Sequence, residues 1–257
     1  MVEDAKTAVG TSLPVGEATI TRVRQRRMLA ACDVDPARYG GRADPSLLCI
    51  DCILAIRRSK VRTPDRLVHL EQHLELKAEV KLDEKLGVRA KVEKVEQTKD
   101  GERALAVFEF FRGDGTAVAI ARTATLANEP SWLRESGAAK GDPRAGWKLL
   151  GRKLLSAGKA QAYSEETGNR LHFDPAFAVR YGLRAPVANP LMSLTWAFEA
   201  LSANGVPATG RVSARFPAAL FWDDGVDVLV REKGGQITAV RCVSSAGALI
   251  ADIEVAA

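Results

Sequence analysis

Two apolar segments of equal length dominate the hydrophobic pattern of the chain, SLLCIDCILAI at residues 46–56 and LMSLTWAFEAL at residues 191–201. A polar residue and a proline precede each segment, as Asp44-Pro45 and as Asn189-Pro190. A polar N-cap followed by proline at the first helical position is typical of a helix start. Because apolar residues cover most of the circumference of each segment, the pattern predicts two helices buried on several sides.

Each predicted helix is followed by segments rich in β-branched and aromatic residues. In the first half these are LVHLEQHLELKAEV, VRAKVEKVEQ, RALAVFEFF and AVAIARTATLA, and in the second half RVSARFPAALF, VDVLVRE, QITAVRCV and ALIADIEVA. Short turns containing glycine, KDG and GDG in the first half and KGG and SAG in the second, join consecutive segments. Glycine turns between β-rich runs indicate hairpins, so the sequence predicts an antiparallel meander in each half.

The loops before the two helices also resemble each other. DPARYGGRADP at residues 35–45 and DPAFAVRYGLRAPVANP at residues 174–190 share Asp-Pro-Ala, an Arg-Tyr-Gly core and a final polar residue with proline. We therefore interpret the chain as an internal duplication with an α+β plan, in which each half is a curved sheet around one hydrophobic helix. The predicted divisions are an N-terminal repeat at residues 1–128, a linker at 129–146 and a C-terminal repeat at 147–257. The linker is rich in Gly, Pro, Ser and charged residues, as domain boundaries often are.

The amino-acid composition indicates which class of protein the chain belongs to. The chain has 257 residues, of which 46% are hydrophobic and 27% charged, as in ordinary globular proteins. No apolar run approaches the ~20 residues that cross a bilayer. The N-terminus lacks the apolar core of a signal peptide, so we expect a cytoplasmic location and no membrane partner.

Charge and cysteine content exclude some functions. The net charge is +5, but the basic residues are scattered without a zinc framework or an aromatic RNA-binding motif, so no nucleic-acid partner is expected. Mild basicity suits an anionic small ligand such as a nucleotide-bearing thioester. Cys49 and Cys52 have CxxC spacing, yet they lie inside an apolar segment, which favours buried structural thiols.

A pair of histidines falls in the first predicted strand. His69 and His73 alternate with Glu71 and Glu75. Because side chains alternate between the two faces of a strand, this pattern predicts one polar sheet face and not a metal site.

Residues 162–194, AYSEETGNRLHFDPAFAVRYGLRAPVANPLMSL, resemble the signature of the MaoC-like dehydratases, which include the R-specific enoyl-CoA hydratases. That signature runs approximately Y-A-x-x-[ST]-G-D-x-N-P-L-H-x-D, followed by a glycine-rich loop and H-G-[MP]-L at the start of the central helix. The resemblance implies a double hotdog fold, with two antiparallel sheets each wrapped around a central helix. It also implies a hydratase or dehydratase acting on enoyl-CoA or 3-hydroxyacyl-CoA thioesters. No metal or other cofactor is implied, since CoA is part of the substrate.

The sequence departs from that signature at two positions. The family's Asp lies five residues before its His, where this chain has Thr167. If two residues are deleted from the loop, Asn169 takes the position of the Asp, which resembles the branch that hydrates mesaconyl- or itaconyl-type thioesters. The glycine at the start of the family's central helix is replaced by Asn189.

The resemblance assigns candidate roles to several residues. His172 would be the base, since an imidazole with an ordinary pKa of ~6.5 can move protons near neutral pH. Asn169 can orient water but cannot accept its proton, so His172 acts alone or with Glu165 or Glu166. The backbone N–H of Asn189 would stabilise the thioester oxygen at the helix mouth.

Tyr163 and Arg170 each have two possible interpretations. Tyr163 is either a pocket residue or a packing residue, and Arg170 either meets a CoA phosphate or is a solvated loop residue. Asp174 is expected to cap a helix that begins at Pro175. In the first half Asp33 occupies the position of His172, so at most one such site exists per chain, and the resemblance implies that residues around 46–56 supply acyl-pocket walls.

Two alternative functions stay open from the sequence. One is a catalytically impaired acyl-CoA-binding hotdog protein, because the family's acid is absent. The other is an acyl-CoA thioesterase, which would need a carboxylate near the helix mouth, where Glu165 and Glu166 are the only nearby candidates. The expected partner is an acyl-CoA or other acyl thioester, and a monomer and a homodimer are both compatible with a duplicated chain.

Overall fold

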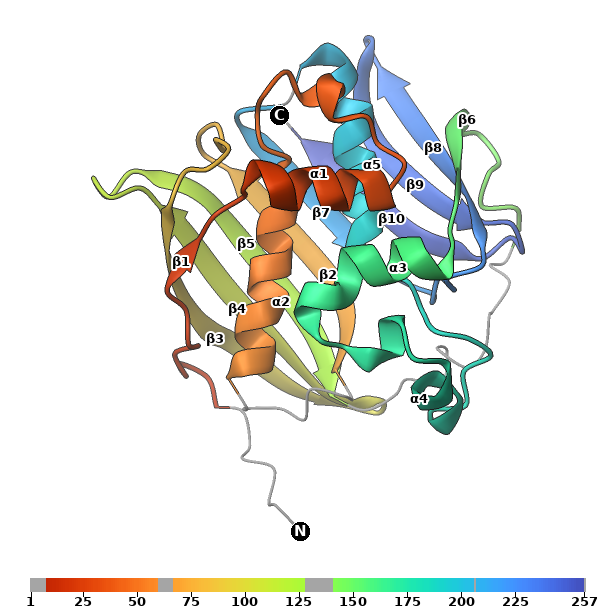
Figure 1. Ribbon diagram of the computed structural model, residues 1–257, viewed down its shortest axis with the longest axis horizontal. Helices are drawn as coiled ribbons and strands as arrows, with labels where there is room; N and C mark the ends of the chain where they lie inside the picture. Colours follow the sequence, from red (N-terminus) through yellow and green to blue (C-terminus); the bar gives the residue numbers. More distant parts are fainter. Residues whose placement is uncertain (1–7, 60–66, 128–140, 206, 257) are drawn as a thin grey trace.

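The computed structural model describes residues 8–59, 67–127, 141–205 and 207–256 (Figure 1). The helices are α1 (Arg22–Ala31), α2 (Leu48–Arg58), α3 (Ala157–Ser164), α4 (Pro175–Arg180) and α5 (Leu191–Leu201). The strands are β1 (Glu17–Ala18), β2 (Leu67–Leu76), β3 (Leu86–Thr98), β4 (Gly101–Phe111), β5 (Ala117–Ala127), β6 (Lys148–Leu154), β7 (Gly210–Arg215), β8 (Gly225–Lys233), β9 (Gln236–Ser244) and β10 (Leu249–Ala256). Short 3-10 turns include η1 (Pro36–Tyr39), η2 (Pro45–Leu47), η5 (Glu165–Thr167), η6 (Arg170–His172) and η7 (Ser202–Asn204).

All ten strands form one antiparallel sheet with the order β1-β3-β4-β5-β2-β7-β10-β9-β8-β6. The order is symmetric about the β2–β7 pair, so β5 corresponds to β10, β4 to β9 and β3 to β8. The sheet curves around α2 in one half and α5 in the other, and the two helices cover the same face (Figure 1). The α+β plan of two hairpin meanders, each around a hydrophobic helix, is confirmed.

A helical turn begins after each polar residue that precedes proline, as the sequence predicts, although the first is the 3-10 turn η2 and α2 itself begins at Leu48. Asp44 Oδ1 accepts a hydrogen bond from Ser46 N at 2.9 Å, and Asn189 Oδ1 accepts one from Leu191 N at 3.0 Å. The Asp174 carboxylate likewise accepts from Phe177 N at 3.0 Å, which confirms it as the N-cap of α4. These side chains satisfy backbone donors that the first helical turn leaves unpaired.

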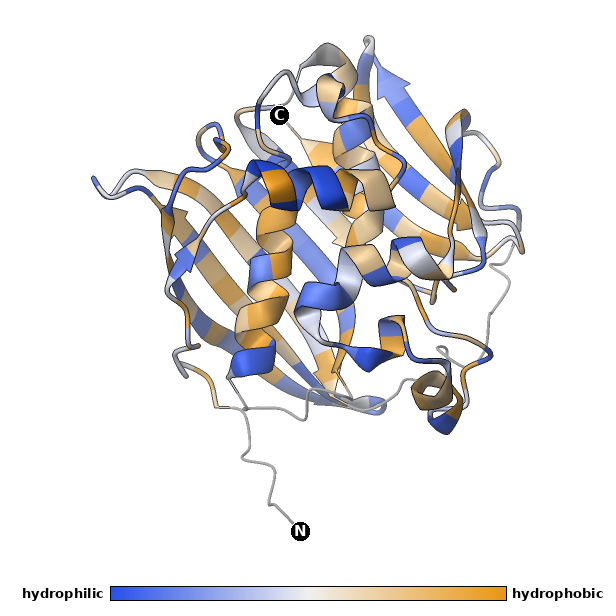
Figure 2. Cartoon of the chain, in the orientation of Figure 1, coloured by the Kyte–Doolittle hydropathy of each residue, from blue (hydrophilic) through white to orange (hydrophobic). Residues whose placement is uncertain are grey.

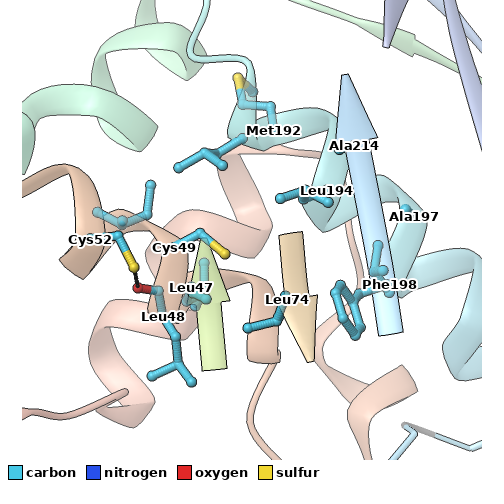
Figure 3. Packing of buried hydrophobic residues seen from close by; sticks show 14 of the residues in the cluster. Leu47, Leu48, Cys49, Cys52, Leu74, Met192, Leu194, Ala197, Phe198 and Ala214 are labelled. Atoms are coloured by element: carbon cyan, nitrogen blue, oxygen red, sulfur yellow. Dashed lines mark hydrogen bonds between the residues drawn. The ribbon is translucent and has the colours of Figure 1, made fainter. Parts of the chain in front are cut away.

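Apolar side chains from the two central helices meet in a shared core. Leu48 and Cys49 of α2 and Leu194 and Phe198 of α5 pack together over the middle strands (Figure 3). Hydrophobic residues run along much of α2 in Figure 2, and nine of the eleven side chains of α5 are buried. All four cysteines are buried and free, so they fill core volume as predicted.

The hydrophobic pattern does not identify α1, α3 and the edge strand β6. Helix α1 reads RVRQRRMLAA, so its charged residues hide a short buried stripe that includes Met28 and Leu29. Thr21 and Ser156 cap α1 and α3 respectively, and the two helices pack against each other. The predicted linker at 129–146 lies largely outside the described residues. Within the described part of the chain, no helix is long and apolar enough to span a bilayer.

Candidate functional site

A mainly apolar cavity of about 100 Å³ lies between the two halves of the chain, beside the start of α5. Its walls come from the end of α2, from β2 and β5, from the loops on either side of α4, and from the segment after β7. The lining residues are Ile53, Arg57, Leu67, Val68, His69, Thr125, Thr167, Asn169, Leu171, His172, Leu183, Val187, Ala188, Asn189, Pro190, Phe216, Ala218, Ala219, Leu220 and Ile250. The cavity therefore brings together three of the predicted site residues, and the first half supplies part of its wall.

His172 ends the turn η6 and is only 8% exposed. Its Nδ1 lies 2.8 Å from the backbone oxygen of Val187. Because a carbonyl oxygen can only accept a hydrogen bond, this contact assigns the proton to Nδ1 and leaves Nε2 with a free lone pair. The imidazole is thus held in the tautomer that a base acting through Nε2 requires.

Asn169 lies next to this lone pair. Its Oδ1 accepts a hydrogen bond from Leu171 N at 3.2 Å, so its Nδ2 is the group that faces His172 Nε2, at 3.3 Å. Thr167, five residues before His172, donates from Oγ1 to Ser164 O at 2.7 Å. The histidine therefore has an amide and not a carboxylate as its nearest side-chain partner.

Burial lowers the pKa of His172 to about 4, and the positive charge of Arg57 acts in the same direction. The hydrogen bond to Val187 works against this change but does not outweigh burial. The ring is consequently neutral near pH 7, and any imidazolium formed there would be unstable.

The start of α5 provides a backbone donor. Ala188 N donates to Leu220 O at 2.6 Å, Leu191 N is capped by the Asn189 side chain, and Pro190 has no N–H. Within the described part of the chain, the backbone N–H of Asn189 has no hydrogen-bond partner, although the residue is only 3% exposed. This donor, at a helix end that carries partial positive charge, is suited to an oxygen that becomes negative.

An ion-pair network from the first half holds the turn that precedes Asn169. Arg24 of α1 contacts Glu166 at 2.7 Å and Asp51 of α2 at 3.0 Å, and Arg27 contacts Glu166 at 2.6 Å. The Glu166 carboxylate is therefore engaged by two guanidinium groups. Neither Glu165 nor Glu166 lines the cavity, so the structure gives no support to a catalytic role for either residue.

Two candidate substrate contacts do not line the cavity. Tyr163 is fully buried, and its hydroxyl lies 3.0 Å from Thr195 Oγ1, which is a packing position. Arg170 is half-exposed, pairs with Asp174 through Nε at 3.0 Å, and lies over the ring of Phe177. Contact of Arg170 with a CoA phosphate stays a prediction, and the structure places Tyr163 apart from the pocket.

The prediction of one polar sheet face is wrong for His69. The pairing of β2 with β5 shifts between His69 and Glu71, which marks a β-bulge. Because the bulge adds one residue, His69 turns to the inner face and lines the cavity, while Glu71 binds Arg103 at 2.7 Å outside the pocket. Among the described residues, no group of three or more His, Cys, Asp or Glu side chains could hold a metal ion.

In the first half, the residues that correspond to Asn189 and His172 are both bonded to neighbouring side chains. Asp44, the counterpart of Asn189, is fully buried and bonded to the hydroxyl of Tyr39 at 3.0 Å. Burial raises the pKa of this carboxyl to about 7. Asp33, at the position of His172, pairs with Lys159 at 2.6 Å. The two halves therefore share a fold but differ in side-chain chemistry.

No protein-family profile matches the sequence, and a search of curated proteins finds no match. Solved structures do match along nearly the whole chain. HtdX of Mycobacterium tuberculosis superimposes with a TM-score of 0.77 at 16% identity, covering 95% of this chain and 99% of that chain. A MaoC-like dehydratase from Phytophthora capsici gives 0.74 at 16% identity, covering 99% and 97%.

Two further solved structures are similar to this chain, and one of them is a thioesterase. A conserved hypothetical protein from Mycobacterium tuberculosis with a double hotdog fold gives a TM-score of 0.59 at 16% identity, covering 96% of this chain and 95% of that chain. An acyl-ACP thioesterase from Bacteroides thetaiotaomicron gives 0.59 at 12% identity, covering 95% and 97%. Fold similarity at this identity does not select one chemistry. The chain has the double hotdog fold of the MaoC-like dehydratases.

Proposed function

We propose that the protein is a hydratase or dehydratase that adds water to an enoyl thioester, such as an enoyl-CoA, or removes it from the 3-hydroxyacyl thioester. The observation that carries this proposal is that the cavity is lined both by His172, whose Nε2 is unprotonated, and by Asn189, whose backbone N–H has no partner among the described residues. An apolar pocket with a few convergent polar groups is the usual form of a site for an acyl ligand.

The Asn189 amide would receive the thioester oxygen. When an oxygen nucleophile adds to the β-carbon, negative charge moves onto the thioester oxygen and gives an enolate. A fixed backbone donor at the start of α5 stabilises that charge, and the apolar surroundings strengthen the interaction. The same contact would align the acyl chain with the cavity.

His172 would move the proton. As the water oxygen bonds to the β-carbon, Nε2 takes a proton from that water and then delivers it to the α-carbon, so atoms and charge balance within one addition. Because burial lowers the pKa of His172 to about 4, the imidazolium returns its proton readily. The contact with Asn169 Nδ2, at 3.3 Å, is longer than a typical hydrogen bond, so a water can replace it at Nε2.

Thioester hydrolysis is less well supported. It would use a carboxylate to attack the carbonyl or to activate water, yet none of the described residues that line the cavity is Asp or Glu. Binding of an acyl thioester without turnover is the second candidate. The observation in its favour is that Thr167 and Asn169 leave His172 without an acidic partner.

One assay separates these functions. The full chain is incubated with crotonyl-CoA and with longer, branched and dicarboxylic enoyl-CoAs, and loss of enoyl absorbance and release of free thiol are followed in parallel. We expect loss of enoyl absorbance without thiol. His172→Ala should abolish this activity, while His73→Ala, on the outer sheet face, should not. Thiol release would indicate a thioesterase, and an undiminished rate in His172→Ala would remove this residue from the mechanism.

A further inference from the structure

Two residue pairs of the β2–β5 ladder, separated by the pair Glu71–Ala124, place polar side chains on the inner face of the sheet. Gln72 is paired with Thr123, and His69 is paired with Thr125. Gln72 shares the inner face with the buried Leu74 by the normal alternation of a strand, and the bulge between His69 and Glu71 brings His69 to that face as well. Only the second pair borders the cavity.

The first pair satisfies its own hydrogen-bonding groups. Thr123 Oγ1 donates to Gln72 Oε1 at 2.9 Å, and Gln72 Nε2 donates to the backbone oxygens of His73 at 3.1 Å and Arg122 at 3.2 Å. Buried polar groups normally reach this state, because an unpaired group in an apolar interior is costly.

In the second pair, His69 has a hydrogen-bonding atom that is not satisfied. His69 Nε2 lies 3.1 Å from the backbone oxygen of Glu71, which fixes the proton on Nε2. The ring also packs edge-on against Phe216, with centroids 5.1 Å apart. Its Nδ1 is buried and, among the described residues, has no hydrogen-bond partner. Burial lowers the pKa of His69 to about 4, so Nδ1 is a bare acceptor at neutral pH.

We propose that His69 and Thr125 form a polar subsite of the acyl pocket that selects an acyl chain carrying a hydroxyl group beyond the reacting carbons. This inference rests on the proposed function of the cavity. The hydroxyl donates to His69 Nδ1, and Thr125 Oγ1 donates to the hydroxyl oxygen. A keto group at the same carbon has no proton to donate, so it leaves Nδ1 unpaired, and a methylene group satisfies neither residue.

The test compares enoyl-CoAs of equal length that carry a methylene, hydroxyl or keto group at successive carbons from the γ-carbon outward. At one position the wild-type protein should prefer the hydroxyl over the methylene compound by about tenfold in kcat/KM, with the keto compound no better than methylene. His69→Phe and Thr125→Val should reduce that preference toward unity. His73→Phe, on the outer face of the same strand, should leave it unchanged.

A second readout separates this inference from the proposed function. Calorimetric titration with the saturated methylene and hydroxyl acyl-CoAs measures the same preference without turnover. If enoyl-CoAs are hydrated but the wild-type protein shows no hydroxyl preference, the subsite is wrong and the proposed function stands. If nothing is hydrated but the tenfold difference in affinity is present and lost in His69→Phe, the subsite stands alone. An unchanged preference in His69→Phe, with a lower melting temperature, would assign His69 a structural role instead.

Discussion

Asn169 Nδ2 lies 3.3 Å from Nε2 of His172, and Asn169 caps the 3-10 turn that His172 ends. The amide orientation is fixed by the bond from Leu171 N to Asn169 Oδ1, so a hydrogen-bond donor and not an acceptor meets the imidazole lone pair. An acceptor beside Nε2 would favour the protonated ring, whereas a donor favours the neutral ring. The pair is therefore arranged to keep His172 unprotonated.

The first prediction concerns the pH dependence of turnover. In the proposed mechanism His172 acts in its neutral form, and its pKa is about 4, so kcat/KM should stay near its maximum as the pH falls through 6.5 and decline only near pH 4. Rates measured between pH 4 and 8, with circular dichroism to confirm folding, test this expectation. An acidic limb centred near pH 6.5 would contradict it.

The variant Asn169→Asp extends that prediction. A carboxylate beside Nε2 stabilises the imidazolium, so the pKa of His172 should rise by about 1–3 units and the acidic limb should move up with it. Asn169→Ala serves as the matched control, since it removes the amide without adding charge. A limb that moves equally in both variants would show that the added charge is not the cause.

The second prediction concerns the ion pairs that hold the turn before Asn169. Arg24 is largely buried between Glu166 and Asp51, so Arg24→Met leaves two carboxylates without their guanidinium partner. Loss of one partner from a buried network typically costs about 3–5 kcal/mol of unfolding free energy. Because Glu166 belongs to the turn before Asn169, kcat should also fall, by about tenfold or more.

Urea denaturation and steady-state kinetics of the same samples measure both effects. Arg22→Met is the control on the same helix, because Arg22 is exposed and pairs with Asp83, and such pairs contribute about 0–1 kcal/mol. Equal losses of stability in the two variants would indicate that burial of the network is not important.

Local chemistry is what made much of this fold predictable. Asp44-Pro45 and Asn189-Pro190 define helix starts through caps that involve neighbouring residues only, and the glycine turns define hairpins in the same way. Proximity of His172, Asn169 and Asn189 could be inferred because all three belong to the motif that resembles a known family.

The features that escaped prediction depend on long-range contacts. A one-residue bulge is set by the pairing of β2 with β5, so the sequence of β2 alone places His69 on the wrong face. The contact of Arg24 with Glu166 joins residues from different halves of the chain. The charged surface of α1 hides its buried stripe, and α1 packs against α3, a helix that the hydrophobic pattern does not identify either.

The third prediction separates the side chain of Asn189 from its backbone. Asn189→Ala removes the side-chain acceptor for Leu191 N at the start of α5, which should cost about 1 kcal/mol of unfolding free energy, but it retains the backbone N–H of residue 189. We therefore expect kcat/KM to stay within about twofold of wild type. Asp174→Ala, which removes the cap of α4, gives the reference for stability. A loss of about a hundredfold in kcat would show that the Asn189 side chain is itself the donor to the substrate.

The fourth prediction concerns Asp44, the counterpart of Asn189 in the first half. Its carboxyl keeps its proton up to about pH 7 in the folded protein but loses it near 3.8 when unfolded. Folding is therefore penalised progressively as the pH rises from about 4 to 7, and the penalty is constant above that range. Asp44→Asn retains an acceptor for Ser46 N without a titrating group, so it should be more stable than wild type at pH 7 and above, by up to about 4 kcal/mol.

His69 and His172 change the unfolding free energy in the opposite direction. Because each is a buried neutral histidine with a pKa near 4, the folded protein becomes less stable as the pH falls below 6.5. Wild type and Asp44→Asn both carry these histidines. The difference between their unfolding free energies therefore reports the effect of the Asp44 carboxyl alone. Urea denaturation at intervals from pH 4 to 8 should show a difference that grows with pH and then levels off near 7. A difference independent of pH would mean that Asp44 is already ionised in the folded protein, and that Tyr39 and Ser46 stabilise the carboxylate in place of solvent.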